Sequence, residues 1–222
     1  MNMLIENIPK LFKASILTIE LTIFSLIIGI FIGLFFAILR LSKNKIIFNF
    51  AYYYSFIFRG TPLLVQIFII YFGLAQLDFI RDSFMWIVLK KPFACAILAF
   101  SLNTGAYTSE IFRSGFEKID KNILEAAKAL GISNLNTFIK IKLPIAIRQS
   151  LPAYGNEMIL MLKGTSLAST ITLIDLTGAA KHIISTNFNP VEVFIFAGSI
   201  YLFFTFLIHN LIKFAEKKMS HN

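Results

Sequence analysis

An apolar stretch reads ASILTIELTIFSLIIGIFIGLFFAIL from Ala14 to Leu39, and Glu20 is its one charged residue. The hydrocarbon core of a bilayer is about 30 Å thick, and an α-helix crosses it with about 20 mostly apolar residues. The stretch is therefore long enough to form a transmembrane helix.

The composition of the whole chain supports a membrane protein. Of the 222 residues, 57% are hydrophobic and 15% are charged, and the mean hydropathy is +0.74. An average soluble domain is about 45–50% apolar and about 25% charged, and a chain of this size has too little interior to bury the excess. The single Cys95 excludes an internal disulfide or a zinc-binding cysteine cluster, and the three histidines have no metal-ligand spacing, so we expect no metal site.

Four further stretches are long and apolar enough to span a membrane, although the second and the fourth contain polar residues. They are Phe56–Leu77, Pro92–Phe112, Leu151–Leu173 and Val193–Phe214. The sequence therefore predicts an all-α membrane protein with five transmembrane helices in a single domain, residues 1–222.

The distribution of basic residues predicts the orientation. Thirteen of the 21 Lys and Arg residues lie in the segments 40–54, 113–150 and 213–222, which five spans would place on one side of the membrane, whereas six lie on the other side. Cytoplasmic loops carry the excess of Lys and Arg, which predicts an external N-terminus and a cytoplasmic C-terminus. The net charge of +9 is then mainly a topology signal, and we expect no nucleic-acid partner.

The long cytoplasmic loop, residues 113–150, has the pattern of two short helices joined by an elbow. Residues 120–130 are amphipathic, Asp120 is suited to cap the first helix, and Gly131 is suited to end it in a left-handed conformation. Ser133 is suited to cap a second helix, which we expect to stop before Pro144. A lone helix this short is marginal in water, so its apolar face needs a surface to dock on. That surface could be the protein's own helices, lipid headgroups or a partner protein.

This loop resembles the EAA signature of ABC importer permeases. All seven specified positions match at the expected spacing, namely Glu125, Ala126, Ala127, Gly131, Ile141, Leu143 and Pro144. The resemblance implies the type I ABC importer permease fold, and it implies that the loop docks in a cleft on a separate ATPase subunit. In that interpretation the alanines keep the helix slim, the glycine permits a sharp turn, and Glu125 places a carboxylate near basic groups of the partner.

Three other blocks resemble one branch of this family, the permeases for polar amino acids of the histidine, glutamine and arginine type. They are Phe58–Gln66 (FRGTPLLVQ), Gly105–Arg113 (GAYTSEIFR), and Leu151–Glu157 (LPAYGNE) followed by Leu162–Ser169 (LKGTSLAS). Gly164 departs from the pattern, because many relatives carry an acidic residue after the lysine. The likeness covers most of residues 14–169, whereas the last third matches more in hydropathy than in motif.

The resemblance also implies the partners. A binding protein outside the cytoplasm would deliver the amino acid, two permease subunits (two copies of this chain, or this chain with a sister chain) would form the path, and two ATPase subunits would drive transport. The chain lacks the phosphate-loop motif G-x-x-x-x-G-K-[ST]. We therefore expect no enzymatic activity and no cofactor in this chain, with ATP and Mg²⁺ bound by the partner ATPase, at the bacterial cytoplasmic membrane.

Polar residues inside the predicted spans are costly in lipid and so need an explanation. Seven are candidates for the substrate path: Gln66, Asn103, Tyr107, Ser109, Glu110, Asn156 and Glu157. Amides and carboxylates can bind the ammonium and carboxylate groups of a zwitterionic solute. The alternatives are an ion pair of Glu110 with Arg113, and a subunit interface or gate for Asn156 and Glu157.

Three charged residues are candidates for a gate or interface, namely Glu20, Arg59 and Lys163. Glu20 either reaches the outer interface or lines the path, and Arg59 could extend to the cytoplasmic interface.

Two other kinds of protein could share these features. One is a secondary amino-acid transporter driven by an ion gradient, with Glu20, Glu110 or Glu157 as ion sites, although the sequence shows no internal inverted repeat. The other is a membrane scaffold with the loop as its docking site. Uptake that survives ATP depletion would favour the transporter, and partner binding without solute flux would favour the scaffold.

Overall fold

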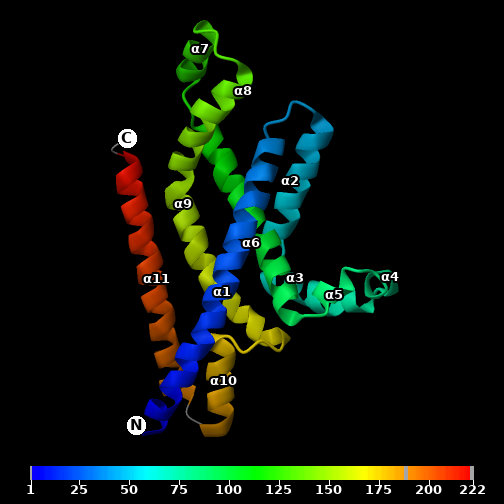
Figure 1. The fold of residues 1–222 in the computed structure, drawn as a ribbon, viewed down its shortest axis with the longest axis vertical. Helices are drawn as coiled ribbons and strands as arrows, with labels where there is room; N and C mark the ends of the chain where they lie inside the picture. The colour runs from blue at the N-terminus through cyan, green and yellow to red at the C-terminus, as the bar shows by residue number, and fades with distance from the viewer. Residues whose placement is uncertain (1, 188–189, 221–222) are drawn as a thin grey trace.

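The computed structural model describes residues 2–187 and 190–220, which hold helices and turns and no strand (Figure 1). Its elements are α1 (Asn2–Leu39), α2 (Lys45–Gly60), α3 (Leu63–Phe68), a π-helical turn (Ile69–Gly73), a 3₁₀ turn (Leu74–Gln76), α4 (Asp78–Arg81), α5 (Trp86–Leu89), α6 (Pro92–Glu117), α7 (Lys121–Ala129), α8 (Asn134–Thr137), a second π-helical turn (Phe138–Lys142), α9 (Leu143–Gly164), a second 3₁₀ segment (Thr165–Ile171), α10 (Leu176–Asn187) and α11 (Pro190–Ser220).

The centre of the fold is the crossing of α1 and α6. Gly29 and Gly33 lie four residues apart on α1, and a Cβ atom at either would lie 2.3 Å from the side chain of Thr104 or 2.5 Å from that of Thr108. The two backbones therefore approach closely because these positions have no side chain, as in other membrane helices with small residues at this spacing. One layer of buried side chains, including Leu21 and Phe100, packs along the same crossing.

The predicted second span is broken. α2 ends at Gly60, and the helical run from Leu63 to Gln76 turns away from it by 103°. Pro62 disfavours helical backbone at the preceding residue, and Thr61 accordingly has extended backbone, with φ −111° and ψ 145°. The break frees backbone carbonyls inside the protein, which need hydrogen-bond donors from elsewhere.

The predicted stop before Pro144 is wrong. α8 continues through the π-helical turn into α9 without leaving helical backbone, and Pro144 lies in the first turn of α9. Pro144 cannot donate to the preceding turn, and it directly follows the π-helical turn, in which the N–H of Leu143 donates to Phe138 O, five residues back. Residues 134–171 thus form one helical run, bent by 50° from α10.

By length and composition, two described segments could each cross a membrane alone, Asn7–Leu39 and Pro190–Met219. Taking each bent helix pair as one span gives up to four in the described residues. The predicted third span lies in α6, which is not among them. This central helix carries many small and hydroxyl residues beside its large apolar ones, which lowers its mean hydropathy. The count of five spans stays a prediction.

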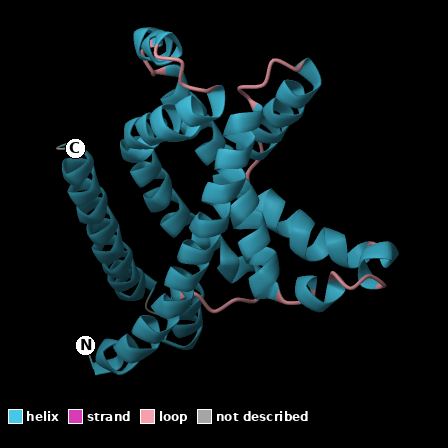
Figure 2. Cartoon of the chain, turned by 45° about the horizontal axis from the view of Figure 1, so that its top comes forward, coloured by secondary structure: helices cyan, strands magenta, loops and turns pink. Residues whose placement is uncertain are grey.

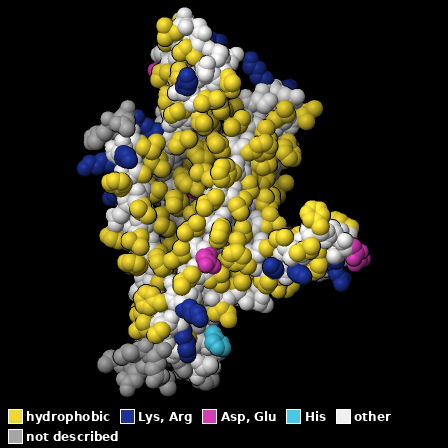
Figure 3. Space-filling view, in the orientation of Figure 1, with side chains coloured by type: hydrophobic (Ala, Val, Ile, Leu, Met, Phe, Trp, Pro, Cys, Tyr) yellow, Lys and Arg dark blue, Asp and Glu magenta, His cyan; other side chains and the backbone are white. Residues whose placement is uncertain are grey.

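The arrangement separates the two ends of the molecule. α7 and α8 lie at one end of the long axis, and α1 begins near the other end (Figure 1). α4 and α5 project sideways, and α11 runs along the outside (Figure 2). On the face drawn in Figure 3, apolar side chains cover the middle, and most Lys and Arg side chains lie toward the margins.

Candidate functional site

The helix that carries the EAA motif forms as the sequence predicts. The Asp120 side chain caps α7 by accepting a hydrogen bond from the backbone N–H of Asn122 at 2.9 Å. At the other end Gly131 has φ +72°, its N–H donates to Lys128 O at 2.9 Å, and the N–H of Ile132 donates to Ala127 O at 3.0 Å. This pair of bonds ends a helix with a left-handed residue, a conformation that glycine adopts without strain.

The predicted apolar face of α7 divides into a packed part and an exposed part. Ile119 and Ala127 are buried, and Leu124 packs with Phe116 and Phe138 near the junction of α6 and α9. Other apolar side chains of this end of the molecule face outward, and they are Ile123 (43% exposed), Leu130 (79%), Leu135 (68%) and Ile139 (50%). The loop therefore has its own support in the fold and still presents an apolar surface.

Among the other motif residues, Glu125 and Ala126 are exposed on α7. Glu125 lines a cavity of about 250 Å³ between α7 and α8, together with the lysines Lys121, Lys128 and Lys142. Ile141 in the π-helical turn and Leu143 at the start of α9 are half-buried, whereas Pro144 is exposed. The exposed carboxylate and the exposed apolar side chains are thus on the same end of the molecule.

Two of the predicted path residues meet at the helix break. The Gln66 amide donates to Phe58 O at 2.7 Å, to Thr61 O at 3.1 Å and to the Thr61 hydroxyl at 2.8 Å. The Asn103 amide donates to Phe58 O at 3.0 Å and to Gln66 Oε1 at 3.1 Å. Both side chains are buried, and they satisfy carbonyls that the break frees.

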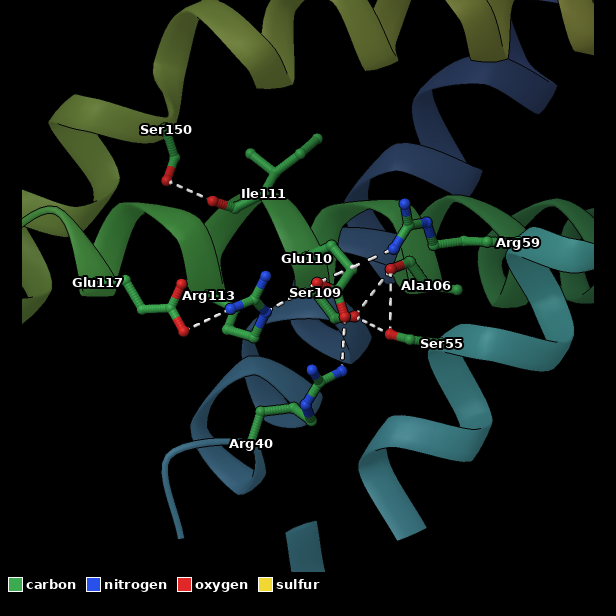
Figure 4. Close-up of polar contacts among 10 residues, drawn as sticks. All are labelled: Arg40, Ser55, Arg59, Ala106, Ser109, Glu110, Ile111, Arg113, Glu117 and Ser150. Carbon is green, nitrogen blue, oxygen red and sulfur yellow. Dashed lines mark hydrogen bonds and ion pairs between the residues drawn. The ribbon is translucent and has the colours of Figure 1, made fainter. Parts of the chain in front are cut away.

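Glu110 lies among three arginines that come from three different parts of the chain (Figure 4). Arg40 Nη1 donates to Oε1 at 2.5 Å, Arg113 Nε donates to Oε2 at 2.7 Å, and Arg59 Nη1 lies 3.9 Å from Oε2. Arg113 also pairs with Glu117. The predicted pair of Glu110 and Arg113 is therefore present, and both carboxylate oxygens already accept a charge-assisted hydrogen bond.

The remaining predicted path residues fall into buried and exposed sets. Ser109 is buried and lies 2.5 Å from the Ser55 hydroxyl, and Glu157 is buried and accepts from Thr104 at 2.7 Å. Tyr107 donates to Arg59 O at 3.5 Å, and Asn156 is exposed. These contacts hold helices together and do not test a role in solute transport, so the role of these residues in the path stays a prediction.

The gate candidates are more exposed. Glu20 and Lys163 lie on the surface of the chain, and the Arg59 side chain is 41% exposed. Arg59 stands over the ring of Tyr107, with the guanidinium carbon 5.4 Å from the ring centre, a cation–π contact.

The sequence interpretation missed two polar residues. The Arg40 side chain is 8% exposed and lies over the rings of Phe48 and Tyr52. Its position directly after a long apolar stretch was the sequence feature that could have drawn attention to it. Asp175 is fully buried and caps α10 by accepting from the N–H groups of Thr177 at 3.2 Å and Gly178 at 3.0 Å. Aspartate is a favoured N-cap residue, but nothing local predicts its burial.

No group of three or more His, Cys, Asp or Glu side chains in the described part of the chain is arranged to hold a metal ion. Cys95 is buried in the core beside Phe100 and Leu21.

Comparison with known proteins identifies close relatives over nearly the whole chain. The nopaline transport system permease protein NocM of Agrobacterium fabrum is 51% identical over 215 residues, which are 96% of this chain and 89% of the relative. The arginine ABC transporter permease protein ArtM of Haemophilus influenzae is 39% identical over 214 residues, 96% of this chain and 94% of the relative.

A solved structure matches the fold as well. A chain from the crystal structure of an amino acid ABC transporter with histidines has a TM-score of 0.85 and 33% sequence identity, and the match covers 97% of this chain and 96% of that one. The resemblance seen in the sequence is thus confirmed, and so is the all-helical permease fold. Residues 29–221 match the binding-protein-dependent transport system inner membrane component, and the chain belongs to this family.

Proposed function

We propose that this chain is the permease subunit of an ATP-driven importer that carries polar amino acids across the bacterial cytoplasmic membrane. The observation that carries the proposal is the end of the molecule formed by α7, Gly131 and α8, where apolar side chains are exposed beside the capped helix. Two relatives named for nopaline and arginine transport support the class of solute.

In this proposal α7 docks in a cleft of a separate ATPase subunit. Ala126 and Ala127 keep the helix narrow, Gly131 turns the chain, and Glu125 faces basic groups of the partner. Ile141, Leu143 and Pro144 begin the long helix that receives the movement. Each ATPase closure would then rock the helices between outward-open and inward-open states.

The proposed topology has five spans, with the N-terminus outside and the C-terminus in the cytoplasm. The position of α7 and α8 at one end of the long axis, with the start of α1 near the other, supports this orientation (Figure 1). The complex would contain two ATPase subunits that bind ATP and Mg²⁺, a second permease subunit and an external binding protein. This chain would perform no catalysis itself.

The path would lie between the two permease subunits. Gln66, Asn103, Tyr107, Ser109, Glu110, Asn156 and Glu157 stay our candidates for the path, and Glu20, Arg59 and Lys163 stay candidates for the gate or interface. Because Gln66 and Asn103 hold the helix break together, their contribution to the path includes keeping its shape.

The decisive test is purification from native membranes in mild detergent, with every co-purifying protein identified by mass spectrometry. We expect an ATPase with a phosphate loop and uptake of amino acid that stops when ATP is depleted. Gly131→Trp should leave the chain in the membrane and abolish uptake, because a bulky side chain at the elbow blocks docking. Uptake that survives ATP loss but ends with the proton gradient would instead identify an ion-driven secondary transporter.

A further inference from the structure

Arg59 has guanidinium donors that the protein leaves unused. Within residues 2–187 and 190–220, its side chain makes one ion pair, the 3.9 Å contact with Glu110, and one ring contact, with Tyr107. No hydrogen bond from the Arg59 guanidinium is found among the same residues, whereas Arg40 and Arg113 both donate to Glu110 at short distance. Arg40 also has an unpaired donor, its Nε, but that atom is buried, whereas the Arg59 guanidinium is exposed and can reach a ligand.

The charges of the cluster leave a positive excess. Four basic groups, those of Arg40, Arg59, Arg113 and the cavity-lining Lys118, face three carboxylates. These are Glu110, Glu117 and Glu157, the last of which interacts electrostatically with Arg59. Since both oxygens of Glu110 already accept hydrogen bonds, this carboxylate is poorly placed to receive the ammonium group of a solute. A ligand that meets the cluster from outside instead meets the positive charge of Arg59.

The Arg59 side chain lines a cavity at the surface of the chain. Arg59 is 41% exposed and lines a cavity of about 250 Å³ with Tyr107, Glu110, Lys118, Gln149 and Ser150. The cavity lies between α6 and the first half of α9, next to the helix break at Gly60. In transporters, broken helices of this kind are typical of solute sites.

The neighbouring face of α9 indicates that water, rather than lipid, covers this cavity. One stripe of exposed residues runs along the helix at spacings of three and four, and it consists of Gln149, Ala153, Asn156, Leu160 and Lys163. Three of these five are polar or charged, and such residues in a membrane helix face a bundle interior or a water-filled path because lipid solvates them poorly. Gln149 and Ala153 also line the cavity of Arg59.

We propose that Arg59 binds the carboxylate group of the carried amino acid as it moves along this face, an inference that rests on the proposed importer function. The planar guanidinium can donate two parallel hydrogen bonds to a carboxylate. Tyr107 holds the guanidinium in place, and the loose contact with Glu110 is exchanged for the closer contact with the solute.

The test uses the complete complex, with ATPase and binding protein, reconstituted in liposomes. An equimolar mixture of the common L-amino acids is supplied, and the accumulated amino acid is identified by chromatography. Arg59→Gln is then compared with Arg59→Lys and with the control Arg81→Gln, which removes another exposed arginine that pairs with an aspartate at 3.9 Å. We expect Arg59→Gln to lower uptake at least about tenfold, as the loss of a charge-assisted hydrogen bond would do, with Arg59→Lys between it and the wild type.

A second measurement separates carboxylate binding from a merely structural role. The melting temperature of the permease–ATPase complex, without binding protein, is measured with the accumulated amino acid and with the amine that lacks its carboxylate. The wild type should be stabilised by the amino acid and not by the amine, and Arg59→Gln should be stabilised by neither compound. If Arg59→Gln does not fold, Arg59→Lys carries the test, because its single ammonium should weaken the preference for the amino acid over the amine.

Each outcome decides the matter. Equal uptake by Arg59→Gln and the wild type, or equal stabilisation by amino acid and amine, would overturn the inference and leave the importer function standing. Loss of bound phosphatidylglycerol in Arg59→Gln, with uptake unchanged, would assign the arginine to a lipid headgroup instead. No ATP-dependent uptake by the wild type itself would refute the proposed function.

Discussion

The side-chain amides of Asn103 and Gln66 meet at 3.1 Å, and both donate to the same carbonyl, that of Phe58. The contact joins α6 to the two halves of the broken helix pair, across 37 residues of sequence. It replaces the helical hydrogen bonds that are lost between Gly60 and Leu63. The side-chain amides of Gln66 and Asn103 thus stabilise the helix break.

Replacing Gln66 by Leu should destabilise the protein, because the side chain keeps its approximate size and loses its donors. Each buried carbonyl or amide left without a partner costs about 1–3 kcal/mol. We expect a lower melting temperature of the detergent-purified protein, measured by intrinsic fluorescence. Gln76→Leu is the matched control, since Gln76 is exposed at the end of the same helical run. Equal melting temperatures for the two variants would contradict the role of Gln66 at the break.

Gly29→Ala and Gly33→Ala should lower the stability of the protein by disturbing the packing where α1 crosses α6. The added methyl group would lie 2.3 Å from Thr104 at the first position and 2.5 Å from Thr108 at the second. Overpacking of this kind costs about 1–3 kcal/mol. The yield and thermal stability of the folded protein in detergent provide the measurement. Gly198→Ala, where no atom lies within 4 Å of the new methyl, should behave as the wild type.

Glu110→Gln should cost far more than Glu117→Gln. The Glu110 side chain is 17% exposed and neutralises two arginines at hydrogen-bond distance, whereas the Glu117 side chain is 60% exposed. Removing one partner of a buried ion pair costs about 3–5 kcal/mol, and an exposed pair contributes about 0–1 kcal/mol. Thermal unfolding of both variants in detergent checks the order. Similar losses of stability would show that Glu110 is solvated more than its exposure indicates.

Substitutions of Gly131 should separate backbone strain from bulk. At φ +72° the left-handed backbone costs a residue with a Cβ atom about 1–2 kcal/mol of conformational free energy, and this cost is smaller for asparagine than for alanine. No atom lies within 4 Å of a Cβ built there, so neither substitution clashes within the chain. We expect Gly131→Asn to retain more ATPase co-purification and uptake than Gly131→Ala. The reverse order would mean that the left-handed turn is not required for docking.

Local patterns predicted those features that depend on neighbouring residues. Asp120 and Gly131 define the ends of α7 through bonds within a few residues, and the long apolar stretches at both ends of the chain became α1 and α11. The apolar stretch Pro92–Phe112 became part of α6, which begins at the same residue, although its small and hydroxyl residues lower its hydropathy.

The polar residues of the interior were harder to interpret. Sequence alone indicates that Gln66 and Glu110 need partners, but the partners come from other helices. The carbonyl that Gln66 reaches exists as a free acceptor only because the chain breaks at Thr61, and Arg40 reaches Glu110 from 70 residues away. A long-range contact of this kind has no periodic signal in the sequence.

The uninterrupted helical backbone from Asn134 to Ile171 has a mechanical consequence. At about 1.5 Å per residue such a rod is roughly 55 Å long, which exceeds the thickness of the hydrocarbon core. The run includes the π-helical turn and Pro144 near its start, and Pro152 lies inside α9. A tilt of this helical run beside α7 would displace its far end sideways, by a distance that grows with the distance from the pivot.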